Sequence, residues 1–228
     1  MLFCCQNNET GTEFAMAEFA KQLHIRPGVT AIIGSGGKTT LMYRLAQELS
    51  AFASVIVTTS THIFPPEHLP CFLRTGTANG VICVGTPSAD GKLTAPEQPF
   101  DELARLADFV LVEADGAAGR PLKAHAPHEP VIPENANQVI CVVGASGIGK
   151  PVEQFVHRPE LFTRLSGEQT ASPEAVACLL KKEHLHTRIL INQADTPEAL
   201  AAAKELAARL TCPVTVASAQ KGEILCSY

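Results

Sequence analysis

Short apolar runs, separated by polar or glycine-rich segments, repeat along the whole chain. Most of these runs are continuously apolar rather than alternating, which is typical of parallel strands that are buried on both faces. Segments with helical character lie between several of them, and this alternation favours a doubly wound α/β fold with a mostly parallel sheet. The predicted strands cover about residues 29–33, 55–59, 81–84, 109–113, 138–143, 188–192 and 213–217.

Two of the predicted helices begin with a hydroxyl residue followed by proline. A serine or threonine at the N-cap accepts a hydrogen bond from the first turn, and proline fits the first helical position. These pairs are Ser172-Pro173 before Ala175–Lys182 and Thr196-Pro197 before Ala199–Leu210, and a further helix is expected over Leu41–Ser50.

The chain has 228 residues, of which 46% are hydrophobic, enough for one α/β domain with a sizeable core. We assign residues 16–228 to this single domain. Residues 1–15 differ in composition, so we expect a flexible N-terminal extension, with Met16 as an alternative start.

Charge and cysteine usage narrow the possible partners. The net charge is −5 and no run of lysine or arginine occurs, which argues against a nucleic-acid partner. No segment has the length of a membrane-spanning helix, and the N-terminus lacks the features of a secretory signal. The eight cysteines form no C-x-x-C, and Cys83 and Cys141 lie in apolar runs. Reduced, buried thiols in a cytoplasmic protein explain this usage best.

The first predicted strand runs into a glycine-rich turn, Gly34-Ser35-Gly36-Gly37-Lys38-Thr39-Thr40, which precedes a helix. Strand, glycine turn, Lys-Thr and helix are the elements of a phosphate-binding loop, in which backbone N–H groups and the helix N-terminus bind an anion. Lys38 can reach the outer phosphates of a nucleotide and Thr39 can bind Mg²⁺. The usual first glycine is replaced by Ile32, and the shorter G-x-x-G-K-T form resembles the ATP loop of Mur-type ligases.

The apolar run Phe109–Val112 ends in Glu113-Ala114-Asp115-Gly116. A carboxylate at the end of a neighbouring strand can hold Mg²⁺ opposite a phosphate loop. Glu113-x-x-Gly116 resembles the third motif of SIMIBI-class GTPases that carry glutamate in this place. We therefore consider Glu113 and Asp115 candidate metal ligands and, with Lys38, candidate catalytic residues; the sequence does not decide which acid lies closer to the metal.

Two later strands end in residues that suit a guanine base. Asn192-Gln193-Ala194-Asp195 resembles the N-K-x-D motif of GTPases, with Gln193 in place of lysine. An aspartate there accepts two hydrogen bonds from guanine N–H groups, whereas adenine presents the wrong pattern. Ser218-Ala219 resembles the Ser-Ala motif that supplies a backbone N–H to guanine. The predicted base contacts are Asn192, Asp195, Ser218 and Ala219, and both GTP and ATP stay open as ligands.

A second glycine-rich segment, Gly144–Lys150, fits G-x-x-x-x-G-K better than the first one does. Pro151 follows it, however, and offers neither a hydroxyl for Mg²⁺ nor an N–H for phosphate. We therefore expect this segment not to bind the nucleotide, although it can still line the site.

Cationic residues follow the predicted metal acids. Arg120, Lys123 and His125 share one loop, and His157-Arg158 forms another cationic spot that can close over it. We interpret these residues as candidate contacts to an anionic substrate. The histidine pairs 125/128 and 184/186 lack a third ligand at short spacing, so surface or loop histidines explain them better than a metal site.

Together these motifs resemble the YqeC family, accessory proteins for selenium-dependent molybdenum hydroxylases. The block from Glu113 to Pro133, with its long Glu-Ala-Asp-Gly to Val-Ile-Pro pattern, carries the resemblance more specifically than the phosphate loop, and the resemblance spans about residues 16–225. It implies nucleotide binding and a role in making or installing a selenium-containing molybdenum cofactor.

Three functions stay open at this point. The first is an accessory protein that binds GTP or ATP with Mg²⁺, a P-loop NTPase-like fold in three layers being expected. The second is a small-molecule kinase or a Mur-ligase-like, ATP-dependent enzyme. The third is a nucleotide-gated chaperone that hands cofactor to a molybdenum hydroxylase with little turnover.

Overall fold

The computed structural model describes residues 18–228. The expectations for residues 1–15 and for Met16 lie outside the described residues. The described chain is an α/β structure built on a nine-stranded sheet in the order β14-β13-β12-β10-β1-β8-β2-β5-β4. Every neighbouring pair in it is parallel except β13–β14, so the predicted mostly parallel α/β sheet is confirmed.

The bounds of the sheet strands agree closely with the apolar runs of the sequence. The strands are β1 Gly28–Gly34, β2 Val55–Thr59, β4 Cys71–Phe72, β5 Val81–Val84, β8 Phe109–Glu113, β10 Ala136–Gly144, β12 Arg188–Asn192, β13 Val214–Ser218 and β14 Glu223–Ser227. Two small sheets accompany them, one of β3 His62–Ile63, β6 Thr86–Pro87 and β7 Leu93–Thr94, the other of β9 Leu122–Lys123 and β11 Val156–His157.

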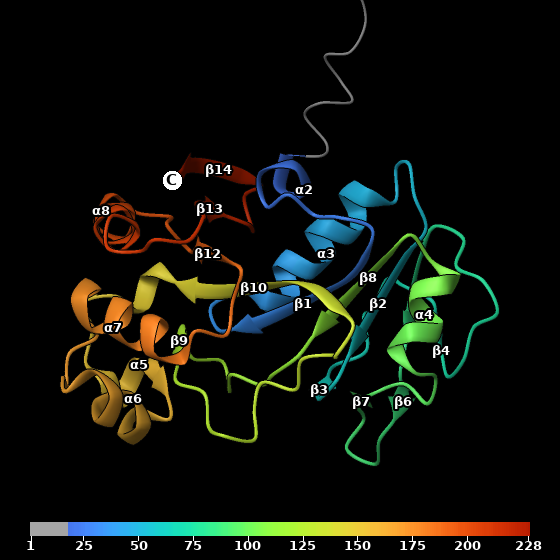
Figure 1. Cartoon of the computed structure of the whole chain (residues 1–228), viewed down its shortest axis with the longest axis horizontal. Helices are drawn as coiled ribbons and strands as arrows, with labels where there is room; N and C mark the ends of the chain where they lie inside the picture. The colour runs from blue at the N-terminus through green and yellow to red at the C-terminus, as the bar shows by residue number, and fades with distance from the viewer. Residues whose placement is uncertain (1–17) are drawn as a thin grey trace, which may run out of the picture.

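Helices cover both faces of the large sheet. They are α2 Glu18–Gln22, α3 Lys38–Leu49, α4 Phe100–Leu106, α5 Val152–Phe155, α6 Pro159–Ser166, α7 Pro173–Glu183 and α8 Pro197–Ala207, with the 3₁₀ turn η1 at Ala145–Gly147. Helix α3 lies along the middle of the sheet, whereas α4 and α5–α8 lie toward its two ends (Figure 1). The predicted caps are present, since Ser172 and Thr196 accept hydrogen bonds from the N–H groups of Ala175 and Ala199.

Alternate residues of the central strands pack into different cores, which gives three layers. Ile32 of β1 packs with α2 and α3, whereas its neighbours Ala31 and Ile33 pack with α5–α8 on the other face. Val110 and Val112 of β8 join a further core under α4. Burial on both faces explains why these strands are apolar throughout.

The cysteines of the described residues are all free thiols. Cys83 and Cys141 are buried, as the apolar runs predict, whereas Cys71 on the short edge strand β4 is exposed. No helix within residues 18–228 combines the length and apolar character needed to cross a membrane.

Candidate functional site

The candidate site lies at the carboxyl ends of β1 and β8, neighbours in the middle of the sheet. Glycines 34, 36 and 37 all have positive φ, which residues with a Cβ rarely adopt. A Cβ on Gly36 would also lie 2.4 Å from the Cα of Gly144, so glycine is required there for packing as well as for backbone conformation. The glycine-rich turn is therefore a tight connection between the end of β1 at Gly34 and the start of α3 at Lys38.

The turn presents a row of unused backbone donors. The first bond of α3 runs from the Leu41 N–H to the Gly37 carbonyl. Within residues 18–228, the N–H groups of Gly36, Gly37, Lys38, Thr39 and Thr40 donate to no protein acceptor. Consecutive free N–H groups at a helix N-terminus attract an anion, because the helix dipole adds to their partial positive charges.

The Lys38 side chain is buried, with 5% exposed. Its Nζ donates to the Gly34 carbonyl at 2.9 Å and lies 3.1 Å from Asp115 Oδ1 and 3.6 Å from Glu113 Oε1. The lysine and both acids predicted from the sequence are thus brought together, although they are 75 or more positions apart in the chain.

Glu113 and Asp115 have opposite pKa shifts. Burial raises the pKa of Glu113, and the charge of Lys38 and a hydrogen bond from Thr39 oppose this only in part. Burial also acts to raise the pKa of Asp115, but the hydrogen bond from His125 and the charges of Lys38 and Lys123 outweigh it and lower the pKa to about 2. The pKa of Asp115 therefore lies below the usual value for aspartate, which favours its ionised form, whereas the pKa of Glu113 lies above the usual value for glutamate.

Thr39 and Glu113 supply the oxygen atoms that suit Mg²⁺. Thr39 Oγ1 donates to Glu113 Oε2 at 2.8 Å, and Thr39 is exposed to solvent. One hydroxyl and one carboxylate, completed by phosphate oxygens and water, match the hard ligands that Mg²⁺ prefers. Asp115 already has several protein partners. Its Oδ2 accepts from the Gly34 N–H at 2.8 Å and contacts His125, and its Oδ1 contacts Lys38. Glu113 is thus the better candidate for the metal. Among the described residues no three His, Cys, Asp or Glu side chains gather as a protein-only metal cage.

The predicted substrate residues Lys123 and His125 are buried and paired. Lys123 Nζ lies 3.3 Å from Asp115 Oδ2 and 3.0 Å from Glu129 Oε1. His125 lies between two carboxylates, with Nε2 2.8 Å from Asp115 Oδ2 and Nδ1 2.8 Å from Glu183 Oε2. Burial acts to lower the pKa of His125, but these two hydrogen bonds raise it overall.

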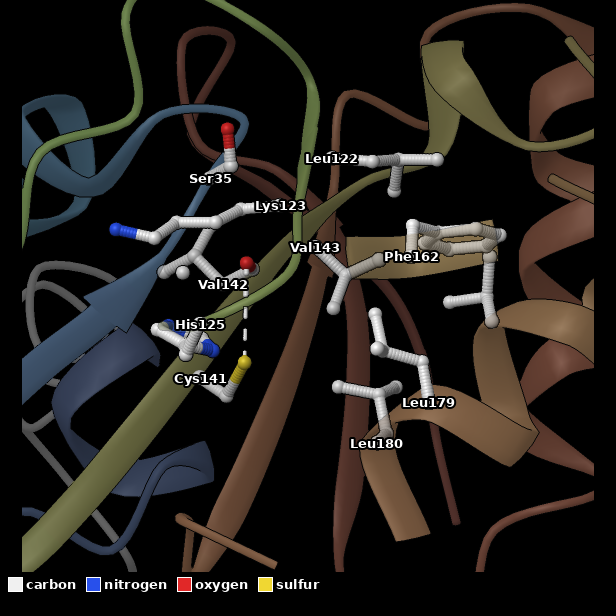
Figure 2. Close-up of a pocket in the computed structure, with 12 residues that line it drawn as sticks. Ser35, Leu122, Lys123, His125, Cys141, Val142, Val143, Phe162, Leu179 and Leu180 are labelled. Atoms are coloured by element: carbon white, nitrogen blue, oxygen red, sulfur yellow. Dashed lines mark hydrogen bonds between the residues drawn. The ribbon is translucent and has the colours of Figure 1, made fainter. Parts of the chain in front are cut away.

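The space around these two side chains is nearly closed. Figure 2 shows Lys123 and His125 beside Cys141, with the apolar side chains of Leu122, Phe162, Leu179 and Leu180 opposite. The cavity that they line holds only about 10 Å³, roughly the space of one water molecule. A substrate anion therefore has no open path to Lys123 or His125. The sequence did not anticipate this, because the pairings depend on how the loop folds and, for His125, on Glu183 of the distant helix α7.

The other predicted cations lie at the edge of the same network. Arg158 Nη2 pairs with Glu129 Oε1 at 2.9 Å, and His157 is half-buried on β11. Burial, with the charges of Lys123 and Arg158, lowers the pKa of His157. Arg120 is exposed, and its carbonyl accepts a hydrogen bond from the Ser35 hydroxyl. Of the predicted substrate contacts, Arg120 and the partly open His157 and Arg158 therefore remain the accessible ones.

The predicted base residues gather at the ends of β12 and β13. Asn192 is buried and joins two segments: its Nδ2 donates to the Gly36 carbonyl at 2.8 Å and its Oδ1 accepts from the Ala219 N–H at 2.8 Å. Asp195 is exposed, and its Oδ1 accepts from the Ser218 hydroxyl at 2.5 Å. Asn192 thus fixes the Gly34–Thr40 turn relative to these strand ends, while the Asp195 carboxylate is exposed to solvent.

The second glycine-rich segment packs against the first one. Gly144 lies against Gly36, and the Ser146 hydroxyl donates to Gln193 Oε1 at 2.6 Å. Residues 145–147 form the 3₁₀ turn η1 rather than the start of a long helix, and Lys150 is exposed. Through Gly144, this segment therefore packs against one side of the Gly34–Thr40 turn.

Comparison with known proteins assigns the family. The family model described as "YqeC protein" matches residues 30–160, which include the Gly34–Thr40 turn, Glu113, Asp115 and the Lys123–His125 segment. This chain belongs to the YqeC family. A relative from Escherichia coli (strain K12), "Uncharacterized protein YqeC", is 35% identical over 167 residues. That match covers 62% of this chain and 62% of the relative. The chain therefore spans less than two thirds of the length of the E. coli relative.

Two site residues of this YqeC protein were not predicted from the sequence. Glu129 and Glu183 hold Lys123 and His125 in place, yet the sequence assigned neither of them a role in the site. Glu129 is part of the segment that resembles the family, which was the available indication. Glu183 is the last residue of α7, a position at which the sequence indicates no more than a surface acid. Its contact with His125 is visible only in the folded structure.

Proposed function

We propose that this chain binds a nucleoside triphosphate with Mg²⁺ at the Gly34–Thr40 loop. The observation that carries the proposal is the row of free N–H groups from Gly36 to Thr40, together with the Lys38–Glu113 and Thr39–Glu113 contacts of the same turn. An anion at this position would receive backbone donors, the helix dipole and one lysine charge together.

Each of these residues has a distinct task in the proposed complex. Lys38 neutralises phosphate charge, and its present bond to the Gly34 carbonyl is the one that phosphate oxygens would replace. Thr39 and Glu113 would hold Mg²⁺, which supplies further neutralisation of the phosphates. Asp115 stays paired with Lys123 and His125, so it keeps Lys38 and the Gly34 N–H in position from behind.

Guanine is the base that the strand ends suit best. Asp195 presents an exposed carboxylate that can accept from guanine N–H groups, and Ser218 orients one of its oxygens. The Ala219 N–H is already bound to Asn192, so Ala219 would act through its place in this turn rather than through a free donor. We therefore propose GTP as the preferred ligand and ATP as the weaker one.

The cellular role that we propose is in maturation of a selenium-dependent molybdenum hydroxylase or of its cofactor. It rests on what the resemblance to the family implies, and the free thiols of the described residues suit a cytoplasmic location. A molybdenum-cofactor or selenium compound and the hydroxylase itself are the partners that this role requires. Exposed Arg120, with the partly open His157 and Arg158, is the remaining candidate contact to such a ligand.

Phosphotransfer to a small molecule is the second candidate function. It is favoured by an open cleft of about 700 Å³ that includes Thr39 and Glu113 among its lining residues. A kinase or Mur-ligase-like enzyme needs such a space beside the terminal phosphate, whereas a chaperone that only senses nucleotide does not.

Calorimetric titration of GTP and ATP, each with and without Mg²⁺, tests the proposal. We expect Mg²⁺-dependent binding, tighter for GTP, and loss of the preference for GTP in Asp195→Asn. Asp101→Asn, an exposed aspartate on α4, is the matched control and should leave both affinities unchanged. A folded protein that binds neither nucleotide contradicts the proposal.

A further inference from the structure

The open cleft beside Thr39 and Glu113 lies on the opposite side of the phosphate loop from the predicted base residues. Its walls come from α3, from the segment after β2, from the β7 hairpin and from the loop after β8. In the sheet, β8 and β2 lie on one side of β1, whereas β12 and β13 lie on the other. A nucleotide whose base lies at Asp195 therefore leaves this cleft empty, and its volume of about 700 Å³ is in the range of small-molecule sites.

One wall of the cleft presents an aromatic ring to solvent. Phe64 is 72% exposed, and Pro65 and Pro66 extend its apolar surface. A phenylalanine ring in water gains free energy when a flat apolar partner covers it. Lys92 Nζ lies 5.4 Å from the centre of the Phe64 ring and also 3.0 Å from Asp90 Oδ2, so a cation borders the ring.

The opposite wall offers unused backbone donors. Within the described part of the chain, the N–H groups of Gly116, Ala117, Ala118 and Gly119 donate to no protein acceptor. Ala118 and Gly119 have positive φ. A Cβ added to Gly116 or to Gly119 would meet nothing within 4 Å, so the backbone of this turn is open to a ligand. Successive N–H groups in such a turn form a concave site for an anion. Glu113 and Glu67 are the acids among the residues that line the cleft.

Two buried cations of the neighbouring loop, Lys123 and His125, offer no alternative place for that anion, because each is bound to two carboxylates. Arg120 of the same loop is exposed, but it is not among the residues that line the cleft. Within the cleft, Lys92 and the N–H groups of residues 116–119 are therefore donors that an anion can use.

We propose that this cleft binds a second small molecule, a planar aromatic or heteroaromatic compound that carries an anionic group. Its ring covers Phe64, and its anionic group is bound by Lys92 and by the N–H groups of residues 116–119. The inference rests on the proposed function only in placing this molecule beside the terminal phosphates of the nucleotide.

A pair of fluorescent probes tests the chemistry of the cleft. 8-Anilinonaphthalene-1-sulfonate is a flat aromatic anion, and N-phenyl-1-naphthylamine is the same ring system without the sulfonate. We expect the anion to bind the intact chain more tightly than the uncharged probe. Phe64→Ala should weaken both probes, whereas Lys92→Gln should weaken only the anion, each by about fivefold.

Matched variants locate the binding. Phe52→Ala removes another exposed phenylalanine, which contacts Phe109 away from the cleft, and Lys204→Gln removes an exposed lysine of α8. Both should leave the probe affinities unchanged. The inference is overturned if Phe64→Ala and Lys92→Gln bind the anion as tightly as the intact chain, or if the two probes bind equally well.

Nucleotide titration of the intact chain, beside the probe titrations of the cleft variants, separates this inference from the proposed function. If the chain binds no nucleotide yet Phe64 and Lys92 determine probe affinity, the nucleotide proposal fails and the cleft proposal stands. If nucleotide binds but neither cleft variant changes probe affinity, only the cleft proposal fails.

Discussion

Replacement of Asp115 with asparagine should destabilise the fold strongly, because Asp115 is the anion at the centre of a buried cluster. Its side chain is 0% exposed, and its Oδ2 is bound by the Gly34 N–H, Lys123 and His125, while Oδ1 faces Lys38. Asparagine keeps the size and one acceptor but removes the charge. Three buried cations then lose their shared partner.

Two separate estimates bound the free energy of unfolding that Asp115→Asn should lose. Removal of one partner from buried ion pairs costs about 3–5 kcal/mol, because the remaining charge is left uncompensated. The pKa of Asp115 falls from 3.8 to about 2 on folding, which corresponds to about 2 kcal/mol of stability at neutral pH. The second figure is smaller because it already includes the cost of burying the carboxylate. We therefore expect a loss of at least about 2 kcal/mol.

Urea unfolding at pH 6, followed by circular dichroism, measures this loss. Asp101→Asn on the exposed face of α4 is the control and should change the free energy of unfolding by less than about 0.5 kcal/mol. Because the folded pKa of Asp115 is lowered, its contribution is complete above pH 3.8 and is lost as pH falls toward 2. The two proteins should thus converge below pH 4. A loss below about 1 kcal/mol at pH 6 would refute the reasoning.

Three further predictions follow from the same contacts. Asn192→Ala leaves the Gly36 carbonyl and the Ala219 N–H unpaired, so the free energy of unfolding should fall by about 2 kcal/mol in a urea titration, and an unchanged midpoint would count against the bridge. Hydrogen bonds raise the folded pKa of His125 above 6.5, so its charge stabilises the fold below pH 6.5 and this contribution is lost as pH rises through the folded pKa. His125→Gln should remove that decline in unfolding experiments above pH 6.5, and a decline that persists would show another group to be its source. Ser172→Ala removes the N-cap of α7 and should cost about 1 kcal/mol in thermal unfolding, with no loss if the cap is unimportant.

The apolar runs predicted the sheet well because burial on both faces leaves a direct mark on the sequence. Each continuous run, such as 109–113 or 188–192, became a parallel strand with nearly the expected bounds. Strand β14 was missed because Glu223–Ser227 alternates between exposed and half-buried residues at the edge of the sheet. The short strand β4 carries too few residues to show any period.

The contacts around the Gly34–Thr40 turn were only partly predictable. Motif spacing brought Lys38, Thr39, Glu113 and Asp115 together in the prediction, because each follows a strand whose end must reach the same edge of the sheet. The state of Lys123 and His125 was not predictable, since it depends on Glu129 and Glu183. Whether a cation is free or neutralised is decided by tertiary pairing, and no local pattern records that pairing.

Lys38 tests the central claim most directly, because it is the charge that the proposed phosphates would require. Calorimetric titration of Mg²⁺–GTP should give saturable binding to the intact chain and none to Lys38→Ala, once circular dichroism shows that the variant is folded. Lys150→Ala, which alters the exposed lysine of the other glycine-rich segment, should bind as the intact chain does. Equal binding by Lys38→Ala, or loss of binding in Lys150→Ala alone, would contradict the account.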